Sequence, residues 1–283
     1  MSSALLPCSL VSVQWLAEYL NTPDVVVLDA SWFLPGSDRN PQQEWREKRI
    51  PGARYFDFDN KIAAPDTELP HMLPSAELFS HAVSELGIKQ HDTIVVYDSQ
   101  GMFSAPRVWW MFRAMGHDSV AVLDGGLPAW EKAELGFESG TAEQPDMTDY
   151  QATYQSQWVI DADELNLRLA AQDTVVLDAR SASRFYGTQP EPRQGVRSGH
   201  MPNAKSLPFS QLIQDGYFLD VEQLSKRFDA LTEPDQKLIF SCGSGVTACI
   251  LALAAELTGR SQLTVYDGSW SEWGRKLKYP VVR

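Results

Sequence analysis

The sequence lacks the features that would direct it to a membrane or to nucleic acid. No run approaches the roughly 20 consecutive apolar residues of a transmembrane helix. Among its 283 residues there are only 24 Lys and Arg against 37 Asp and Glu, and the formal net charge is −13. Such a charge disfavours binding to nucleic acid or to an anionic membrane surface. We therefore expect neither partner, and an anionic substrate must be bound by local cations.

Cysteine is also scarce. Cys8, Cys242 and Cys249 are an odd number and lack the spacing of metal ligands, so we expect neither a disulfide framework nor a metal site. No Lys or Arg precedes Arg39, so the N-terminus has neither the charged region of a signal peptide nor the arginines of a transit peptide. A reducing compartment fits these absences, and we expect a cytoplasmic protein.

The sequence contains an internal duplication. Three segments of the first half recur in the second half in the same order, at an offset near 145 residues. The matching segments are residues 25–30 with 174–179, 50–53 with 201–204, and 123–126 with 266–269. This period is far longer than that of a solenoid repeat. It therefore indicates two copies of one domain.

Within each half, short Val, Ile and Leu runs alternate with helical patterns, for example over residues 76–86, 106–115 and 163–171. This alternation is typical of an α/β fold in which a mainly parallel sheet is covered by helices on both faces. The polar stretch near residues 138–157 predicts an interdomain linker. We therefore predict one domain over residues 1–138, a linker over 139–157, and a second domain over 158–283.

The segment around Cys242 carries the strongest chemical signal. An apolar run over residues 237–240 predicts a buried strand, and a helical pattern follows over residues 247–257. Gly243 and Gly245 lie between them and allow successive N–H groups to converge on one point. A thiolate or a persulfide at that point would be stabilised by the helix N-terminus. The alternative is a buried cysteine without a chemical role.

A related loop in cysteine phosphatases ends in an arginine that clamps the phosphoryl group. The corresponding position, six residues after Cys242, holds Ala248. Without a bidentate cation, a phosphoester dianion would have no strong partner in the loop. We therefore do not expect phosphatase chemistry.

The two halves differ at the position of this cysteine. When the apolar runs 94–97 and 237–241 are aligned, Asp98 falls opposite Cys242. A carboxylate can occupy an anion-binding loop but cannot form a cysteine adduct. We therefore expect only the second half to be chemically active.

Five segments, in order, resemble those of the rhodanese superfamily of tandem-domain sulfurtransferases, and most closely the branch that uses 3-mercaptopyruvate. The segments are residues 71–74, 104–110, 191–193, 242–247 and 266–270, and the resemblance covers nearly the whole chain. It implies two tandem rhodanese-like domains and an enzyme that passes the sulfur of 3-mercaptopyruvate through a Cys242 persulfide. The acceptor would be a thiol, such as that of thioredoxin, or cyanide, and pyruvate would be released. No metal and no organic cofactor are implied.

The resemblance also implies roles for the loop and for two arginines. Residues Gly243, Gly245, Val246 and Thr247 would surround the sulfur. Arg184 and Arg193 would bind the carboxylate and ketone of the donor, for which the planar guanidinium is well suited. Structural ion pairs are the alternative for both arginines.

A proton relay of Ser244, His71 and Asp59 is implied in the same way. A histidine near neutral pKa can move protons, and a carboxylate can orient its ring. The relay requires the segment of Asp59 and His71 to reach the second-half cysteine. Asp57 or Asp66 could orient His71 in place of Asp59, and an exposed histidine without a role is the alternative.

Two other functions remain open at this point. Family members that prefer thiosulfate carry Arg and Lys directly after the cysteine, whereas Gly243 and Ser244 are neutral here. The sequence therefore favours 3-mercaptopyruvate, with thiosulfate:cyanide sulfurtransferase as the alternative. A non-catalytic sulfur-carrier module is a second alternative. We expect a monomer, because two domains can already pack against each other.

Overall fold

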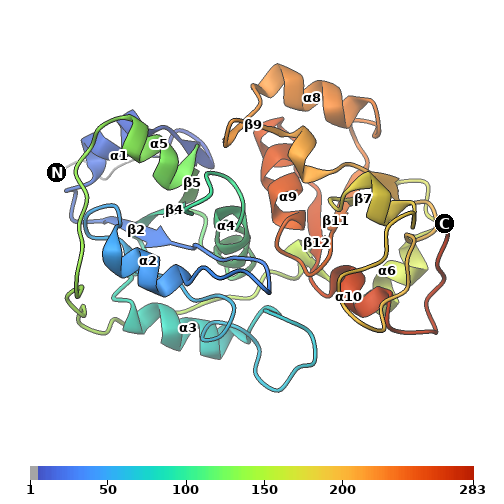
Figure 1. Ribbon diagram of the computed structural model, residues 1–283, viewed down its shortest axis with the longest axis horizontal. Helices are drawn as coiled ribbons and strands as arrows, with labels where there is room; N and C mark the ends of the chain where they lie inside the picture. The colour runs from blue at the N-terminus through green and yellow to red at the C-terminus, as the bar shows by residue number, and fades with distance from the viewer. Residues whose placement is uncertain (1–5) are drawn as a thin grey trace. The chain divides into compact units, whose positions relative to one another are not determined.

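The computed structural model describes residues 6–283 (Figure 1). The chain forms two compact units. The first comprises the residues up to Pro65, Leu73–Tyr154 and Asp215–Phe218, and the second comprises Asp66–Met72, Gln155–Gln214 and Leu219–Arg283. Two short segments are therefore assigned to a different unit from their neighbours in the sequence. In the part of the chain that is described, no helix is long and apolar enough to cross a membrane.

The first unit is built around a five-stranded sheet in the order β1-β5-β4-β2-β3, in which every neighbouring pair is parallel. Its strands are β1 (Leu10–Val11), β2 (Val25–Asp29), β3 (Arg54–Tyr55), β4 (Thr93–Tyr97) and β5 (Val120–Leu123). Its helices are α1 (Val13–Tyr19), α2 (Pro41–Glu47), α3 (Ala76–Glu85), α4 (Ala105–Ala114) and α5 (Gly126–Lys132). Every residue of β2 and β4 is buried, as expected for parallel strands that helices cover on both faces.

The second unit repeats this topology, with a parallel sheet in the order β6-β12-β11-β7-β8. Its strands are β6 (Val159–Ile160), β7 (Thr174–Asp178), β8 (Lys205–Ser206), β11 (Lys237–Ser241) and β12 (Leu263–Tyr266). Its helices are α6 (Ala162–Arg168), α7 (Ala182–Phe185), α8 (Val221–Asp229), α9 (Ala248–Leu257) and α10 (Ser269–Trp273). Two short 3-10 helices lie at Ser156–Trp158 and Phe209–Gln211, and β9 (Ile213–Gln214) also belongs to this unit. The strand β10 (Tyr217–Phe218), which pairs with β9, lies in the segment assigned to the first unit. The predicted fold class of two duplicated α/β domains is confirmed.

The matching strand orders make β4 the counterpart of β11. Asp98 is the first residue after β4, and Cys242 is the first residue after β11. The structure therefore confirms the alignment of these two residues, at the carboxyl end of the central strand of each sheet. In an open parallel sheet this end is where ligands usually bind.

The stretch over residues 139–157, which the sequence predicts to be a linker, packs partly into the first unit. Tyr150 is 1% exposed, and its N–H donates to Ser84 Oγ at 3.0 Å. The Thr148 hydroxyl donates to the Ile88 carbonyl at 2.5 Å. The predicted boundaries at residues 138 and 158 stay predictions.

The equivalent carboxylates Asp29 and Asp178 differ in their surroundings. Asp178 forms a buried ion pair with Arg180 at 2.7 Å, whereas the residue two positions after Asp29 is Ser31. Asp29 is 1% exposed and accepts the Ser31 N–H at 2.8 Å. Burial raises the pKa of Asp29 to about 6, although hydrogen bonds from Ser31 and Tyr97 oppose the shift. The ionised form of Asp29 therefore destabilises the first unit.

Replacing Asp29 by Asn should remove a pH dependence of stability. Because the folded state binds this proton more tightly than the unfolded state, the free energy of unfolding falls as pH rises from about 4 to about 6. The neutral amide keeps an oxygen for the Ser31 N–H, so Asp29→Asn should be more stable than the natural chain at pH 7. We expect a gain of about 1–3 kcal/mol.

The measurement is urea unfolding, followed by tryptophan fluorescence between pH 4.5 and 7.5. Asp24 is exposed and directly precedes β2. Asp24→Asn is therefore the control, and it should keep the wild-type pH profile of unfolding. An Asp29→Asn variant whose unfolding retained the natural pH profile would contradict the assignment.

Candidate active site

Cys242 lies between the central strand of the second unit and helix α9. It is 2% exposed, and its Sγ accepts the N–H of Gly245 at 3.1 Å. Gly245 has a φ of +83°, a left-handed conformation that glycine adopts without strain and that turns this N–H toward the sulfur. Helix α9 begins at Ala248, so the loop also precedes a helix N-terminus. The predicted order of strand, glycine loop and helix is confirmed.

Three residues at the start of α10 hold the first two peptides of this loop. The Cys242 N–H donates to Ser269 Oγ at 3.1 Å, and the Trp270 N–H donates to the Cys242 carbonyl at 3.0 Å. The Gly243 carbonyl accepts both the N–H of Ser271 at 2.9 Å and its hydroxyl at 2.6 Å. The loop backbone is therefore held at several points before any ligand binds.

Ser269 contacts Cys242, and the sequence alone did not indicate this contact. Its φ is +48°, which is unusual for a residue with a side chain, and its Oγ lies 4.0 Å from Cys242 Sγ. The matching residue in the first unit is Gly126, with a φ of +52°. A serine in a conformation for which the other unit uses glycine is the sequence signal that could have pointed to its hydroxyl.

The corresponding loop of the first unit holds a carboxylate. Asp98 is fully buried, and its Oδ2 accepts the N–H groups of Phe103, Ser104 and Ala105 at 2.8–2.9 Å. Its Oδ1 accepts the N–H of Gln100 at 2.8 Å. Four backbone amides therefore converge on one anion at this position of the fold.

A chain of buried ion pairs reaches from β7 to Arg184. Asp178 pairs with Arg180 at 2.7 Å, Arg180 with Glu191 at 2.8 Å, and Glu191 with Arg184 at 2.5 Å. The side chains of Asp178, Arg180 and Glu191 are at most 3% exposed, whereas that of Arg184 is 23% exposed. The Arg180 guanidinium also lies 4.1 Å from the ring centroid of Trp270. These contacts fix the position of Arg184, which is the last residue in this series of ion pairs and the one accessible to solvent.

Arg184 and Arg193 both lie near the loop of Cys242. A Cβ built on Gly243 would lie 3.2 Å from Arg184 Nη2. Burial lowers the pKa of Arg193, the charge of Cys242 opposes this shift, and the cations Arg184 and Arg275 add to it. Arg193 is therefore close enough to Cys242 and to the cations Arg184 and Arg275 for their charges to interact. Arg275, an exposed residue, is one that the sequence analysis did not single out.

The other predicted residues fall in two places. Ser244 is 8% exposed, Val246 is 3% exposed, and Thr247 directly precedes α9. His71 is 3% exposed with a φ of +42°, and its segment Asp66–Met72 belongs to the second unit, as the Cys242 loop does. Asp59 belongs to the first unit, so its part in a relay stays a prediction.

The remaining cysteines have no such environment. Cys249 is fully buried in α9, and its thiol donates to the Gly245 carbonyl at 3.2 Å. Cys8 is exposed. Over residues 6–283, no group of three or more His, Cys, Asp or Glu side chains is arranged to hold a metal ion.

Comparison with known proteins agrees with this geometry. The protein-family model for the rhodanese-like domain matches residues 12–133 and 161–276 of this sequence. The chain therefore belongs to the rhodanese family. It is 40% identical to human 3-mercaptopyruvate sulfurtransferase, over 96% of this chain and 94% of the relative. It is 42% identical to the Arabidopsis thaliana mitochondrial thiosulfate/3-mercaptopyruvate sulfurtransferase 1, over 96% of this chain and 77% of the relative.

The fold is also similar to a crystal structure, that of the 3-mercaptopyruvate sulfurtransferase SseA from Escherichia coli. The TM-score is 0.84 at 36% identity, and the match covers 94% of this chain and 100% of that chain. The likeness thus extends over both units of the chain.

Replacing Glu191 by Gln should destabilise the second unit. The buried Arg180 would keep Asp178 but lose its second carboxylate, and breaking a buried ion pair typically costs about 3 kcal/mol or more. Glu164→Gln is the matched control, because its pair with Arg168 has the same N–O distance of 2.5 Å but is 42–48% exposed. The control should cost less than about 1 kcal/mol. Thermal and urea unfolding measure both, and equal losses would argue against a structural role for the buried chain.

Proposed function

We propose that the chain is a 3-mercaptopyruvate sulfurtransferase that works through a persulfide on Cys242. The observation that carries this proposal is the environment of its sulfur. Cys242 Sγ accepts a backbone N–H from a glycine loop, and Arg193 is close enough for a charge on this sulfur to interact with it. The equivalent loop of the first unit surrounds a carboxylate with four amides, which supports a preference of this loop for negative charge.

The reaction begins with attack of the Cys242 thiolate on the sulfur of 3-mercaptopyruvate. An S–S bond forms, the carbon–sulfur bond of the donor breaks, and its electron pair leaves on carbon as the enolate of pyruvate. The proton of the donor thiol ends on that carbon, so the products are pyruvate and a Cys242 persulfide anion. Fixed amide dipoles stabilise this anion without reorganisation.

The donor is oriented by the two arginines that lie near the loop. Arg184 and Arg193 bind the carboxylate and the ketone, and the chain of buried ion pairs holds Arg184 in place. Glu191 occupies part of the Arg184 fork, so the donor meets the side of the guanidinium that faces Gly243. Local cations thereby offset the net charge of −13, which disfavours an anionic substrate.

Proton transfer is assigned to Ser244 and His71. His71 is buried and lies in the same unit as Cys242, which supports a role near the sulfur. Asp59 is proposed as the carboxylate that orients its ring. In this arrangement the relay takes the proton from the donor thiol and returns it to the enolate carbon.

Thiosulfate is the second candidate donor, because the plant relative is named for both donors. The neutral Gly243 and Ser244 favour 3-mercaptopyruvate, since a dianion would profit from cations at these positions. We further propose that the persulfide passes to a thiol acceptor, thioredoxin or a similar thiol, with cyanide as a substitute, and that the protein acts as a monomer in the cytoplasm.

The test of the proposed function is the mass of the protein after reaction. Incubation with 3-mercaptopyruvate should add one sulfur atom to the chain, and a reductant should remove it, because a persulfide is a reducible adduct. Cys242→Ser should show no adduct and no turnover. Cys249→Ser, which alters a buried thiol in the same helix-and-loop segment, is the control that keeps both.

The ratio of kcat/KM for 3-mercaptopyruvate and for thiosulfate then separates the two donors. A higher value for thiosulfate would favour the second candidate. Full turnover by Cys242→Ser would refute the persulfide, and a persulfide that formed without turnover would indicate a carrier module.

Removing either donor-binding arginine should impair substrate binding. Arg184→Ala and Arg193→Ala should each raise KM for 3-mercaptopyruvate at least tenfold, since a charge-assisted hydrogen bond contributes about 1.5–3 kcal/mol. The Arg→Lys variants should recover part of this loss, because Lys keeps the charge without the bidentate fork. Steady-state kinetics measure the effect, with Arg168→Ala on exposed α6 as the control. If both alanine variants kept the wild-type KM, the two arginines would have a structural role only.

A further inference from the structure

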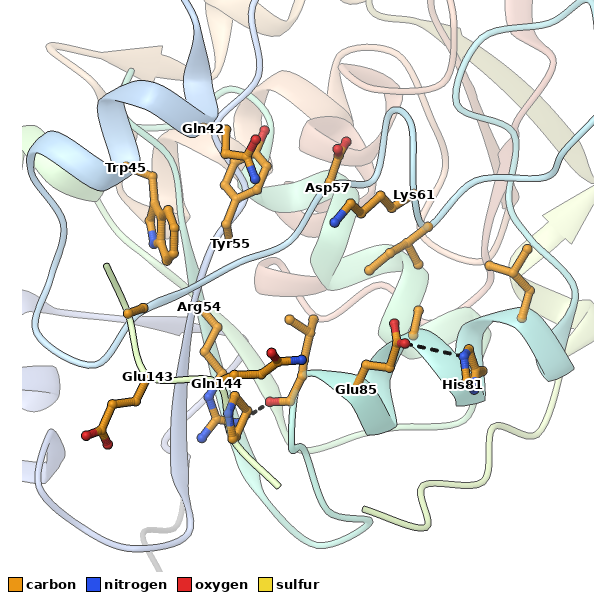
Figure 2. A pocket seen from close by; sticks show the side chains of 16 residues that line it. Gln42, Trp45, Arg54, Tyr55, Asp57, Lys61, His81, Glu85, Glu143 and Gln144 are labelled. Atoms are coloured by element: carbon orange, nitrogen blue, oxygen red, sulfur yellow. Dashed lines mark hydrogen bonds and ion pairs between the residues drawn. The ribbon is translucent and has the colours of Figure 1, made fainter. Parts of the chain in front are cut away.

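A cavity of about 490 Å³ lies in the first unit, beside the edge strand β3 (Figure 2). It is bounded by α2, β3, α3 and residues 142–145, all of which belong to the first unit, whereas the Cys242 loop belongs to the second. Its volume is in the range of cavities that bind small molecules. Of the residues considered above for sulfur transfer, only Asp57, an alternative to Asp59, lines it.

Two aromatic rings form one wall of this cavity. The ring centroids of Trp45 and Tyr55 are 6.0 Å apart with an interplanar angle of 42°. The indole N–H of Trp45 donates to the Ala53 carbonyl at 3.0 Å, and the Tyr55 hydroxyl donates to the Ser31 carbonyl at 3.4 Å. Their polar atoms are thus already bonded, and what the two side chains offer a ligand is ring surface.

The guanidinium of Arg54 also lines the cavity. Arg54 is half-buried, and its Nη1 donates to the Leu86 carbonyl at 2.5 Å. No carboxylate of residues 6–283 forms an ion pair with it. Burial lowers the pKa of Arg54, and the charge of Asp92 opposes this shift. A half-buried cation without an ion-pair partner would be stabilised by an anionic ligand.

The other charges around the cavity disfavour a ligand with more than one negative charge. Glu85 pairs with His81 at 3.4 Å, and Asp57 Oδ1 accepts the N–H and the side-chain amide of Asn60 at 3.0 and 3.1 Å. Glu143 and the exposed Lys61 complete the charged lining. The three carboxylates repel a doubly charged phosphate more strongly than a single carboxylate, and a single carboxylate can pair with Arg54.

The second unit contains a comparable cavity of about 510 Å³, between its edge strand β8 and helix α8. Lys205 donates to the Leu231 carbonyl at 2.5 Å, just as Arg54 donates to the Leu86 carbonyl after α3. Ser206 stands where β3 has Tyr55, and none of the described residues that line this cavity is aromatic. The duplicated fold therefore produces a cavity in both units, and the aromatic wall is particular to the first.

We propose that the first-unit cavity binds a small planar monocarboxylate. The ring of the ligand packs against Trp45 and Tyr55, and its carboxylate accepts hydrogen bonds from Arg54. The aromatic side chains thus contact the ring of the ligand, and the guanidinium of Arg54 binds its carboxylate. The site is distinct in composition from the Cys242 loop, and it does not depend on the function proposed above.

The test is an NMR titration of the full-length protein with benzoate, following the indole N–H of Trp45. Trp45→Phe identifies this signal by its loss. Benzoate should shift it saturably, and benzamide, which has the same shape without the charge, should bind at least tenfold more weakly. Phenyl phosphate should also bind more weakly than benzoate, because of the surrounding carboxylates.

Arg54 variants provide the decisive comparison. Arg54→Met should weaken benzoate binding at least tenfold. Arg54→Lys should weaken it by a smaller factor, and it preserves the fold, since Lys205 makes the equivalent bond in the second unit. Lys205→Arg is the matched control and should leave the affinity unchanged. Equal affinity in the natural chain and both Arg54 variants, equal binding of benzamide, or tighter binding of phenyl phosphate would overturn the proposal.

Discussion

The structure depends on one constraint, which is that backbone N–H groups in the loop after the central strand of each sheet need an acceptor. Backbone N–H groups at a helix N-terminus all point the same way, and an unfilled ring of donors would cost free energy. In the first unit the carboxylate of Asp98 satisfies four of them. In the second unit the sulfur of Cys242 occupies the corresponding place and accepts the Gly245 N–H. The duplication thus provides one loop that holds a carboxylate and one that holds a cysteine.

The residues around the two loops also differ between the units. In the second unit, Arg180 joins Asp178 to Glu191 and thereby anchors Arg184 beside Gly243. In the first unit, Ser31 stands in the place of Arg180, and Asp29 is left buried with a raised pKa. The series of ion pairs is therefore a feature of the unit that contains Cys242. It places the Arg184 guanidinium beside the Cys242 loop in a protein of strongly negative net charge.

Much of this arrangement could be predicted from the sequence. The duplication, the parallel sheets and the position of Cys242 between a strand and a helix follow from local patterns of apolar residues and glycines. The contacts of Ser269 and Ser271 with the Cys242 loop did not follow, because they join residues 27 and 28 positions apart in the chain. The ion pairs of Glu191 join nearer residues, but they depend on how the loop folds back on itself. That the His71 segment must reach the second half was implied only by the family resemblance, and the structure assigns residues 66–72 to the second unit.

The sequence by itself determined the fold class, the number of repeats and which half places a cysteine at the end of its central strand. These properties depend on periodicity and on the identity of single residues, which are local. Only the tertiary structure decided how Arg184 is held, which hydroxyls fix the loop of Cys242, and that an aromatic wall and Arg54 border a cavity at the edge of the first sheet. The physical reason is that hydrogen bonds, ion pairs and cavities are defined by distances between residues that the chain brings together only on folding.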